Sequence, residues 1–184
     1  SCAVFDASGQ LCAQAAHIPV HLGSMAFAMR DIVAGRDWQP GDQVMLNDPY
    51  LGGTHLPDVT LIAPVFADGR LQAFVVNRAH HADIGAASPG SMPISSHLDE
   101  EGLVIEPTLL ARGNVMVAEQ LRRVTAATRN SAEAGGDFAA QVAANRAGAA
   151  RLGELIARYG SASFADAIEA LNAYAERLAR ESLG

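Results

Sequence analysis

The fold is decided by residues 59–77, which read Val-Thr-Leu-Ile-Ala-Pro-Val-Phe-Ala-Asp-Gly-Arg-Leu-Gln-Ala-Phe-Val-Val-Asn. Two runs rich in β-branched and aromatic residues, 59–66 and 71–77, lie on either side of four residues that suit a turn. The Asp-Gly pair at the centre favours a two-residue type I′ turn. The stretch therefore predicts an antiparallel β-hairpin in which Ala67 is opposite Arg70.

The segments around this hairpin predict further short elements. Residues 2–6 and 11–14 have the pattern of two strands joined by a turn at Ala-Ser-Gly, residues 7–9. Residues 24–34 predict a short helix that ends at Gly35. After the central hairpin, residues 84–101 contain so many Gly, Pro and Ser residues that we expect an ordered loop.

The last third of the chain has a helical pattern. Apolar residues recur at spacings of three and four over residues 138–159, with Asn145 as the one polar interruption, and Gly160 ends the pattern as a C-cap. Ser163 and Asp166 resemble the capping box of a second helix. The apolar stripes of both helices indicate a core or a surface that faces a partner, and neither stripe carries visible chemistry.

These elements predict an α+β fold, in which a β-hairpin-rich N-terminal two-thirds is followed by antiparallel helices. We expect a β-rich metal-site region at residues 1–111 and a helical region at residues 112–184. The chain begins with Ser1, and the helical pattern continues to its last residues. We therefore expect it to be a truncated part of a larger subunit.

Composition excludes several classes of function. The formal charge of −7 argues against nucleic-acid binding, which needs a basic surface. No run of about 18 apolar residues is present, so no membrane span is expected. All 13 basic residues are arginines, which excludes a Schiff-base lysine and the lysine of a phosphate-binding loop. Cys2 and Cys12 are not placed opposite each other in their hairpin, so we expect free thiols and a cytoplasmic location.

Two polar clusters stand at the open end of the central hairpin. The first is Asn-Asp-Pro-Tyr-Leu-Gly-Gly-Thr-His-Leu-Pro-Asp, residues 47–58, and the second is Asn-Arg-Ala-His-His-Ala-Asp, residues 77–83. Because the hairpin brings the two clusters together, their imidazoles and carboxylates could converge. Such nitrogen and oxygen donors suit zinc, manganese or ferrous iron.

The predicted pairing leaves the choice of histidine open. Extending the ladder from the turn puts Asp58 opposite Ala79 and Pro57 opposite His80. A regular pleat would then place His81 on the face of Asp58, but Pro57 interrupts the ladder at that point. The residues alone therefore do not decide between His80 and His81.

Other polar residues of these segments have two readings. His55 and Asp58 could form a structural hydrogen bond instead of a metal site. His17 and His21 are separated by Ile-Pro-Val, and we expect them to be structural or to orient the ligands. Asp48 and Asp83 are our candidates for orienting imidazoles or acting as the catalytic base, although either could cap a turn.

Six segments, taken in order, resemble the hydantoinase B/5-oxoprolinase family. The resemblance covers nearly the whole chain, whereas a considerable C-terminal part of a family member is absent. The segments are Ser-Cys-Ala-Val-Phe-Asp (1–6), His-Ile-Pro-Val-His-Leu-Gly-Ser-Met (17–25), the cluster at 47–58, Ala-His-His-Ala-Asp-Ile-Gly (79–85), Ser-Pro-Gly-Ser-Met-Pro (88–93) and Gly-Asp-Phe-Ala-Ala-Gln-Val-Ala-Ala-Asn (136–145).

The resemblance implies a metal held by His55, Asp58 and His80, where His80 opens the His-x-x-Asp-x-Gly segment. It also implies a hetero-oligomer in which a hydantoinase A-type subunit uses ATP and Mg²⁺ to activate a carbonyl. This chain would then open a cyclic amide such as 5-oxoproline, a hydantoin or a lactam by hydrolysis. The alternatives are the metal subunit of an ATP-dependent ketone carboxylase and a non-catalytic assembly module. Ala86 departs from the family, which often has a second glycine after Gly85, and this affects the expected shape of the loop.

Overall fold

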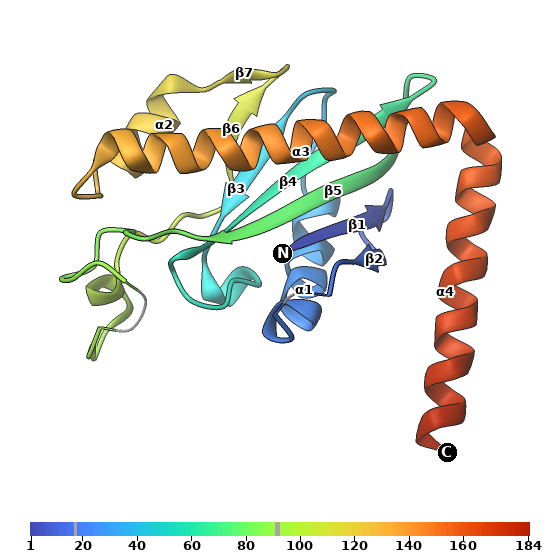
Figure 1. The fold of residues 1–184 in the computed structure, drawn as a ribbon, viewed down its shortest axis with the longest axis horizontal. Helices are drawn as coiled ribbons and strands as arrows, with labels where there is room; N and C mark the ends of the chain where they lie inside the picture. The colour runs from blue at the N-terminus through green and yellow to red at the C-terminus, as the bar shows by residue number, and fades with distance from the viewer. Residues whose placement is uncertain (17, 91–92) are drawn as a thin grey trace.

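A computed structural model describes residues 1–16, 18–90 and 93–184, and it confirms the α+β class (Figure 1). In these residues one seven-stranded sheet has the order β2-β1-β5-β4-β3-β6-β7, and every neighbouring pair is antiparallel. The strands are β1 (Cys2–Asp6), β2 (Leu11–Gln14), β3 (Gln43–Leu46), β4 (Asp58–Ala67), β5 (Arg70–His80), β6 (Thr108–Arg112) and β7 (Val115–Met116).

Helices cover both faces of this sheet. Helix α1 lies on one face, and the long helix α3 crosses the other (Figure 1). The helices are α1 (Val20–Ala34), α2 (Ala118–Thr125), α3 (Ser131–Tyr159) and α4 (Ser161–Leu183), and two 3-10 turns are η1 (Pro49–Leu51) and η2 (Leu98–Glu101). None of the helices in the described part of the chain is both long and apolar enough to cross a membrane.

The central hairpin, formed by β4 and β5, has the predicted turn but a different register. Asp68 and Gly69 have φ angles of 53° and 71°, as a type I′ turn requires. Ala67 pairs with Arg70 as predicted. One residue pair farther from the turn, a β-bulge at Gln72 shifts the register and leaves Gln72 without a partner on β4. From the bulge to the open end of the hairpin, each residue of β4 pairs one residue farther along β5 than predicted. The predicted pairing of this part of the hairpin was therefore wrong.

Alternation along these strands divides the core between the two faces. The face toward α1 is built from side chains of β1, β3, β4 and β5 that pack on the helix. They include Phe5, Leu46, Ile62, Phe74 and Val76, which form one buried cluster with Met25 and Met29 of α1. The same alternation continues to the strand ends, so Asp58 and His80 also belong to the α1 face.

The opposite face combines apolar packing with a buried amide network. Phe138, Val142 and Ile156 of α3 pack on the sheet, so the first predicted helical stripe is core except at its last residue, Tyr159, which is exposed. Asn145, the polar interruption of that stripe, donates to the carbonyl of Leu61 at 3.1 Å. Its side-chain oxygen accepts a hydrogen bond from Asn77, and its amide donates to Gln43, which together tie three segments across the sheet.

Several smaller predictions can be compared with the structure. The first hairpin is confirmed, and both cysteines are free. Helix α1 ends before Gly35 as predicted but begins four residues earlier than expected, at Val20. Helix α3 ends at Gly160 as predicted. The capping box at Ser163 was wrong, because α4 begins at Ser161 without a side-chain cap.

Strands β3, β6 and β7 and helix α2 were not predicted. The segment 84–101 is a loop in its described residues except for the 3-10 turn η2 at its end. Helix α3 contacts the sheet along β4 and β5, so the β-rich and helical parts of the chain pack together. The division between regions at residue 112 stays a prediction.

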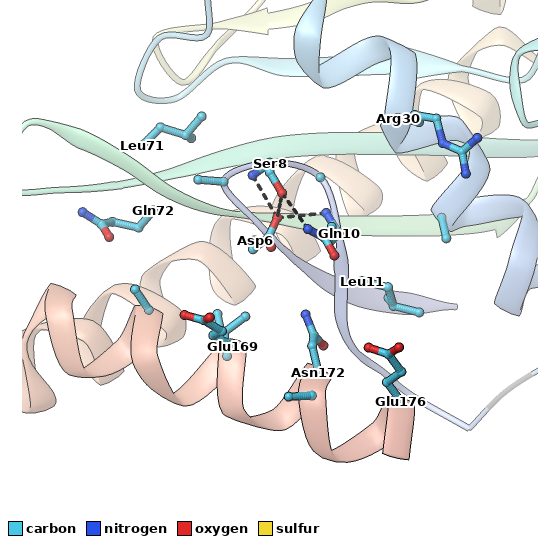
Figure 2. A pocket seen from close by; sticks show the side chains of 16 residues that line it. Asp6, Ser8, Gln10, Leu11, Arg30, Leu71, Gln72, Glu169, Asn172 and Glu176 are labelled. Atoms are coloured by element: carbon cyan, nitrogen blue, oxygen red, sulfur yellow. Dashed lines mark hydrogen bonds between the residues drawn. The ribbon is translucent and has the colours of Figure 1, made fainter. Parts of the chain in front are cut away.

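Helix α4 turns away from the end of α3 and runs beside the β1–β2 hairpin (Figure 1). Between them lies an open cleft of about 1000 Å³. Figure 2 shows Asp6, Ser8 and Gln10 of the hairpin on one side and Glu169, Asn172 and Glu176 of α4 on the other. The cleft lies apart from the polar clusters at the end of the central hairpin, none of whose residues line it.

Candidate metal centre

The candidate centre forms where β4 begins and β5 ends. Asp58 is the first residue of β4, His80 is the last of β5, and the two are directly opposite in the ladder. Opposite residues of an antiparallel pair project from the same face. The one-residue bulge therefore brings the imidazole of His80, and not that of His81, beside the Asp58 carboxylate.

His55 reaches the same point from the loop before β4. A tight turn closes in front of the strand, because the Asp58 amide donates to the His55 carbonyl at 2.9 Å. The loop itself is anchored by Asn47, whose side chain donates to the Leu56 carbonyl at 2.7 Å and accepts from the Ile105 amide at 2.6 Å. Gly53 lies against the Asn47 carbonyl, where no Cβ would fit. This packing fixes the position of the loop that carries His55.

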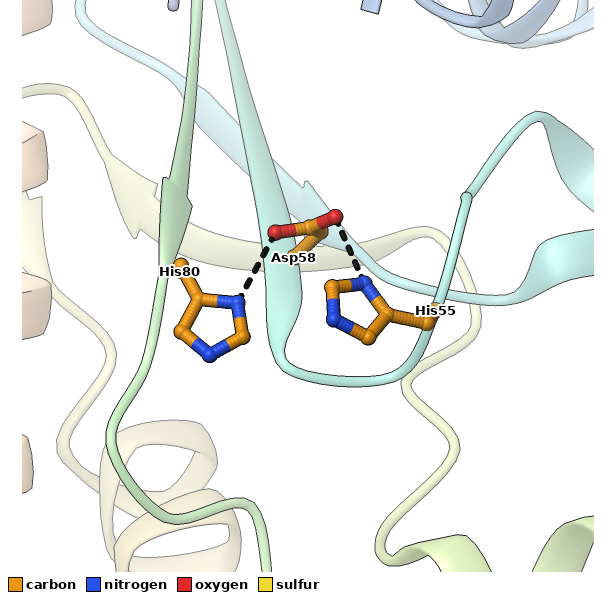
Figure 3. Close-up of side chains that lie close together, drawn as sticks. All are labelled: His55, Asp58 and His80. Carbon is orange, nitrogen blue, oxygen red and sulfur yellow. Dashed lines mark hydrogen bonds and ion pairs between the residues drawn. The ribbon is translucent and has the colours of Figure 1, made fainter. Parts of the chain in front are cut away.

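The imidazoles of His55 and His80 converge on the Asp58 carboxylate (Figure 3). His55 Nδ1 lies 2.7 Å from Asp58 Oδ2, and His80 Nδ1 lies 3.3 Å from Asp58 Oδ1. One ligand atom from each residue can be chosen so that all three lie within 4.8 Å of one another. The Asp58 side chain is 6% exposed, whereas those of His55 and His80 are 31% and 45% exposed. The cluster is thus buried on the carboxylate side and open on the imidazole side.

The surroundings keep Asp58 ionised. Burial raises the pKa of this carboxyl, but the hydrogen bond from Thr54 and the nearby His55, His21 and His80 lower it more, so that the pKa lies below its ordinary value. The Thr54 hydroxyl donates to Asp58 Oδ2 at 2.6 Å. A charged carboxylate oxygen is the form in which aspartate binds a metal ion.

A third imidazole contacts the same carboxylate from α1. His21 Nε2 lies 3.4 Å from Asp58 Oδ2, and its Nδ1 lies 2.8 Å from the Ser1 hydroxyl. Burial lowers the pKa of His21 below its ordinary value, although Asp58 raises it. These contacts fit the predicted orienting role of His21, whereas His17 lies outside the described residues.

A buried arginine adjoins the cluster on the same face. Arg78 lies two residues before His80 on β5 and is 2% exposed. Burial lowers the pKa of its guanidinium to about 10, and the negative charge of Asp58 acts in the opposite direction. The side chain is therefore charged at neutral pH. Neither Arg78 nor Thr54 was predicted as part of the site. Each is a single polar residue without a spacing or motif that indicates a function.

His81 belongs to the opposite face of the sheet. Its Nε2 lies 2.8 Å from Gln141 Oε1, and its ring packs against Phe138 with centroids 4.5 Å apart. Burial lowers the pKa of His81, while the contact with Gln141 raises it. His81 is thus held by α3 and does not join the cluster.

The two aspartates predicted as catalytic make other contacts. Asp48 accepts from the Tyr50 amide at 2.8 Å and caps the 3-10 turn η1. Asp83 accepts from the amides of Gly85 and Arg129 and pairs with the Arg129 guanidinium at 3.0 Å. Within residues 1–16, 18–90 and 93–184, neither carboxylate is hydrogen-bonded to the three converging side chains. Their role in orienting ligands or as a base stays a prediction.

The donor set suits a divalent transition metal. Catalytic zinc sites use three protein ligands drawn from histidine and carboxylate and leave a position for water or substrate. Two histidines and one carboxylate with open positions also suit ferrous iron. The partly exposed imidazoles leave room for such a position, so the residues fit a metal ion.

The whole chain is similar to known proteins. A family model described as hydantoinase B/oxoprolinase matches residues 1–184. The chain is 41% identical over 163 residues to a 5-oxoprolinase of Dictyostelium discoideum, which covers 87% of this chain and 13% of the relative.

Two solved structures are similar to this chain. The ATP-dependent caprolactamase from Pseudomonas jessenii has a TM-score of 0.94 and 33% identity, covering 100% of this chain and 32% of that one. An acetone carboxylase in nucleotide-free form has a TM-score of 0.75 and 21% identity, covering 89% of this chain and 22% of the other, and shares the fold alone. The chain thus spans less than a third of the length of each of these proteins. Because the family match spans the whole chain, the chain belongs to the hydantoinase B/oxoprolinase family.

Proposed function

We propose that this chain supplies the metal centre of an ATP-dependent enzyme that opens a cyclic amide by hydrolysis. The observation that carries the proposal is the convergence of His55, His80 and the buried Asp58 carboxylate at the ends of β4 and β5. The names of a related 5-oxoprolinase and of the similar caprolactamase support a cyclic amide as the substrate.

The three residues have separate tasks in this proposal. Asp58 contributes the negative charge that attracts a divalent ion, and its low pKa keeps that charge available at neutral pH. His55 and His80 contribute neutral nitrogen donors on the open side, where substrate can approach. A divalent transition metal such as Zn, Mn or Fe, when bound, supplies Lewis acidity that makes a hydroxide nucleophile available near neutral pH.

Activation of the carbonyl is assigned to a partner. The chain has no lysine and no glycine-rich phosphate loop before a helix, so we assign ATP and Mg²⁺ to a hydantoinase A-type subunit or region of the same assembly. Phosphorylation there would make the ring carbon electrophilic and turn its oxygen into a leaving group. Hydroxide attack on that carbon would give a tetrahedral adduct, and cleavage of the ring C–N bond, with the nitrogen taking up a proton, would open the ring to an acyl phosphate. Hydrolysis of the acyl phosphate would then release phosphate and the free carboxylate.

A variant of the complete assembly tests this division of work. We expect His80→Ala to abolish ring opening of 5-oxoproline, hydantoin or caprolactam in single-turnover assays with ATP. ATP hydrolysis should persist without product, because activation occurs at another site. The measurement is product formed per ATP hydrolysed, together with metal content by plasma mass spectrometry.

His97→Ala is the matched control, because His97 is an exposed histidine that precedes η2 and lies outside the cluster. It should leave both product and metal unchanged. Normal ring opening by His80→Ala would contradict the proposal. Product that forms only from a ketone in the presence of bicarbonate would instead identify a carboxylase.

A further inference from the structure

The guanidinium of Arg78 connects the elements that carry the candidate centre. It donates to the Thr60 hydroxyl at 2.7 Å, to the Ser24 hydroxyl at 2.7 Å and to the Gly52 carbonyl at 2.7 Å. Each of its three nitrogens therefore has a different partner. These partners belong to β4, to α1 and to the loop after η1.

Each partner lies a few residues from one member of the cluster. Thr60 follows Asp58 by two residues on β4 and projects from the same face. Gly52 precedes His55 by three residues in the loop. Arg78 itself precedes His80 by two residues on β5, so one side chain spans all three segments that supply candidate ligands.

The third contact, with Ser24, joins Arg78 to α1, the helix whose His21 contacts the Asp58 carboxylate. Ser24 lies three residues, or nearly one turn, after His21 on α1. The loop is pressed on this helix at Gly52, where an added Cβ would collide with Ala28. The guanidinium therefore lies at the junction of α1, the loop and the two strands.

We infer that Arg78 is a positioning residue that holds the His55, Asp58 and His80 side chains at the separation a metal ion requires. This inference rests on the proposed metal centre. A planar guanidinium offers five N–H donors in a fixed fork, so it can bond to three oxygens in fixed directions. A lysine ammonium keeps the charge but lacks that fork.

A buried arginine costs free energy, and nothing would offset that cost if the Arg78 side chain only filled space. Among the described residues no carboxylate lies within salt-bridge distance of Arg78, although the side chain is almost fully buried. Burying a charge costs free energy that its hydrogen bonds must offset, and well-packed apolar residues often replace even buried ion pairs without loss of stability. Three directed hydrogen bonds to segments of one site therefore indicate control of geometry.

The test removes the partners of Arg78 one at a time and measures Co²⁺ binding to the full-length protein by its visible absorption. Thr60→Val and Ser24→Ala each delete one hydroxyl and change little else. We expect each to weaken Co²⁺ binding by about tenfold, as is typical for groups that orient ligands, and to alter the absorption spectrum. Arg78→Lys should weaken binding at least as much.

Thr125→Val is the matched control. Thr125 is also a buried threonine, but its hydroxyl donates to the Leu121 carbonyl within α2. Its replacement should leave the Co²⁺ affinity and spectrum at wild-type values even if the thermal midpoint falls. This separates an effect on the site from a general loss of stability.

A double mutant shows whether Ser24 acts through Arg78. In the Arg78→Lys background, Ser24→Ala should have little further effect on Co²⁺ affinity. If Arg78→Lys does not fold, the two single hydroxyl variants decide the question.

The possible results separate the two proposals. Wild-type affinity and spectrum in both Thr60→Val and Ser24→Ala would overturn the role of Arg78 and leave the metal centre standing. Absence of Co²⁺ binding by the wild-type protein, or unchanged binding by His80→Ala, would overturn both.

Discussion

His80 and His81 are neighbours in the sequence, but they belong to opposite faces of the sheet. His80 is directly opposite Asp58 on the α1 face and is partly exposed. His81 is buried on the α3 face between Gln141 and Phe138. The two histidines should therefore respond differently to the same substitution.

We expect His80→Ala to empty the candidate centre with little loss of stability, because it removes one of three ligands from an exposed position. His81→Ala should keep most of the metal but lower the free energy of unfolding by about 2–3 kcal/mol, since it removes a buried ring and leaves the Gln141 side-chain oxygen without its His81 partner. Metal analysis and urea denaturation of both variants measure the two effects. Full metal in His80→Ala, or loss of metal in His81→Ala alone, would show that His81 is the ligand.

At the scale of elements, α3 holds the strands of the central hairpin together from the face opposite the centre. The Gln141 amide donates to the Val59 carbonyl at 2.9 Å and to Asn77 Oδ1 at 2.8 Å, so that it bridges β4 and β5. Its oxygen faces His81. Val59 on β4 is adjacent in sequence to Asp58, and His81 after β5 is adjacent to His80. Gln141 therefore contacts the neighbours of two candidate ligands.

Replacing this bridge should destabilise the fold. We expect Gln141→Leu to lower the free energy of unfolding by about 2–4 kcal/mol, because several buried polar groups lose their partner. Gln39→Leu, at an exposed glutamine, should change it by less than about 0.5 kcal/mol. Urea denaturation gives both values, and equal effects would contradict the structural role of Gln141.

A second connection joins the loop after β5 to the turn between α2 and α3. Partial burial raises the pKa of the Asp83 carboxyl, but the hydrogen bonds from Arg129 and Gly85 together lower it more, so that the pKa lies below its ordinary value. A carboxyl with a lowered pKa in the folded state stabilises the fold above its unfolded pKa of about 4, and this contribution is lost as the pH falls through the folded pKa.

We therefore expect Asp83→Asn to cost about 1 kcal/mol at pH 7, since the Arg129 side of the ion pair is half exposed and screened by solvent. The difference from wild type should shrink as the pH is lowered below about 4. Thermal unfolding from pH 7 to pH 3 measures this, with Asp99→Asn, at an exposed aspartate, as the control. A difference that grows on acidification would contradict the assigned sign.

At the scale of the whole molecule, α4 lies beside β2 at the edge of the sheet, and none of its residues is buried. Leu171, Tyr174 and Leu178 are each about half exposed and recur at helical spacing. Of its predicted stripe, Phe164 at the start of the helix packs against the core formed by α3 and the sheet. Contiguous apolar surfaces of this kind are usually covered in a stable assembly.

We expect residues 1–184 on their own to self-associate through this helix. Replacing both Leu171 and Leu178 by Ser should reduce the association without lowering the thermal midpoint, because neither side chain is part of the core. Val115→Ser, at an exposed residue of β7, is the control and should leave association unchanged. Sedimentation velocity over a range of concentrations measures the effect, and a monomer at high concentration would contradict the expectation.

The sequence by itself determined the features that depend on neighbouring residues. The type I′ turn at Asp68 and Gly69 follows from their tolerance of positive φ, and the end of α3 follows from Gly160. The clusters at 47–58 and 77–83 also showed that imidazoles and carboxylates would meet at one end of the hairpin. Strands β3 and β6 were not foreseen, because they depend on pairing with segments distant in the sequence. Strand β7 pairs with the neighbouring β6, but its two residues are too few to show a strand pattern.

The residues alone did not decide which histidine meets Asp58; the family resemblance implied His80, and the tertiary structure gives the physical reason. Turn chemistry fixes the pairing of Ala67 with Arg70, whereas burial of Phe74 and Val76 against α1 fixes the face of β5 farther along. The two requirements differ by one residue, and the bulge at Gln72 absorbs the difference. Because side chains alternate between faces with a period of two, this single residue moves His80 to the centre and His81 to the opposite face.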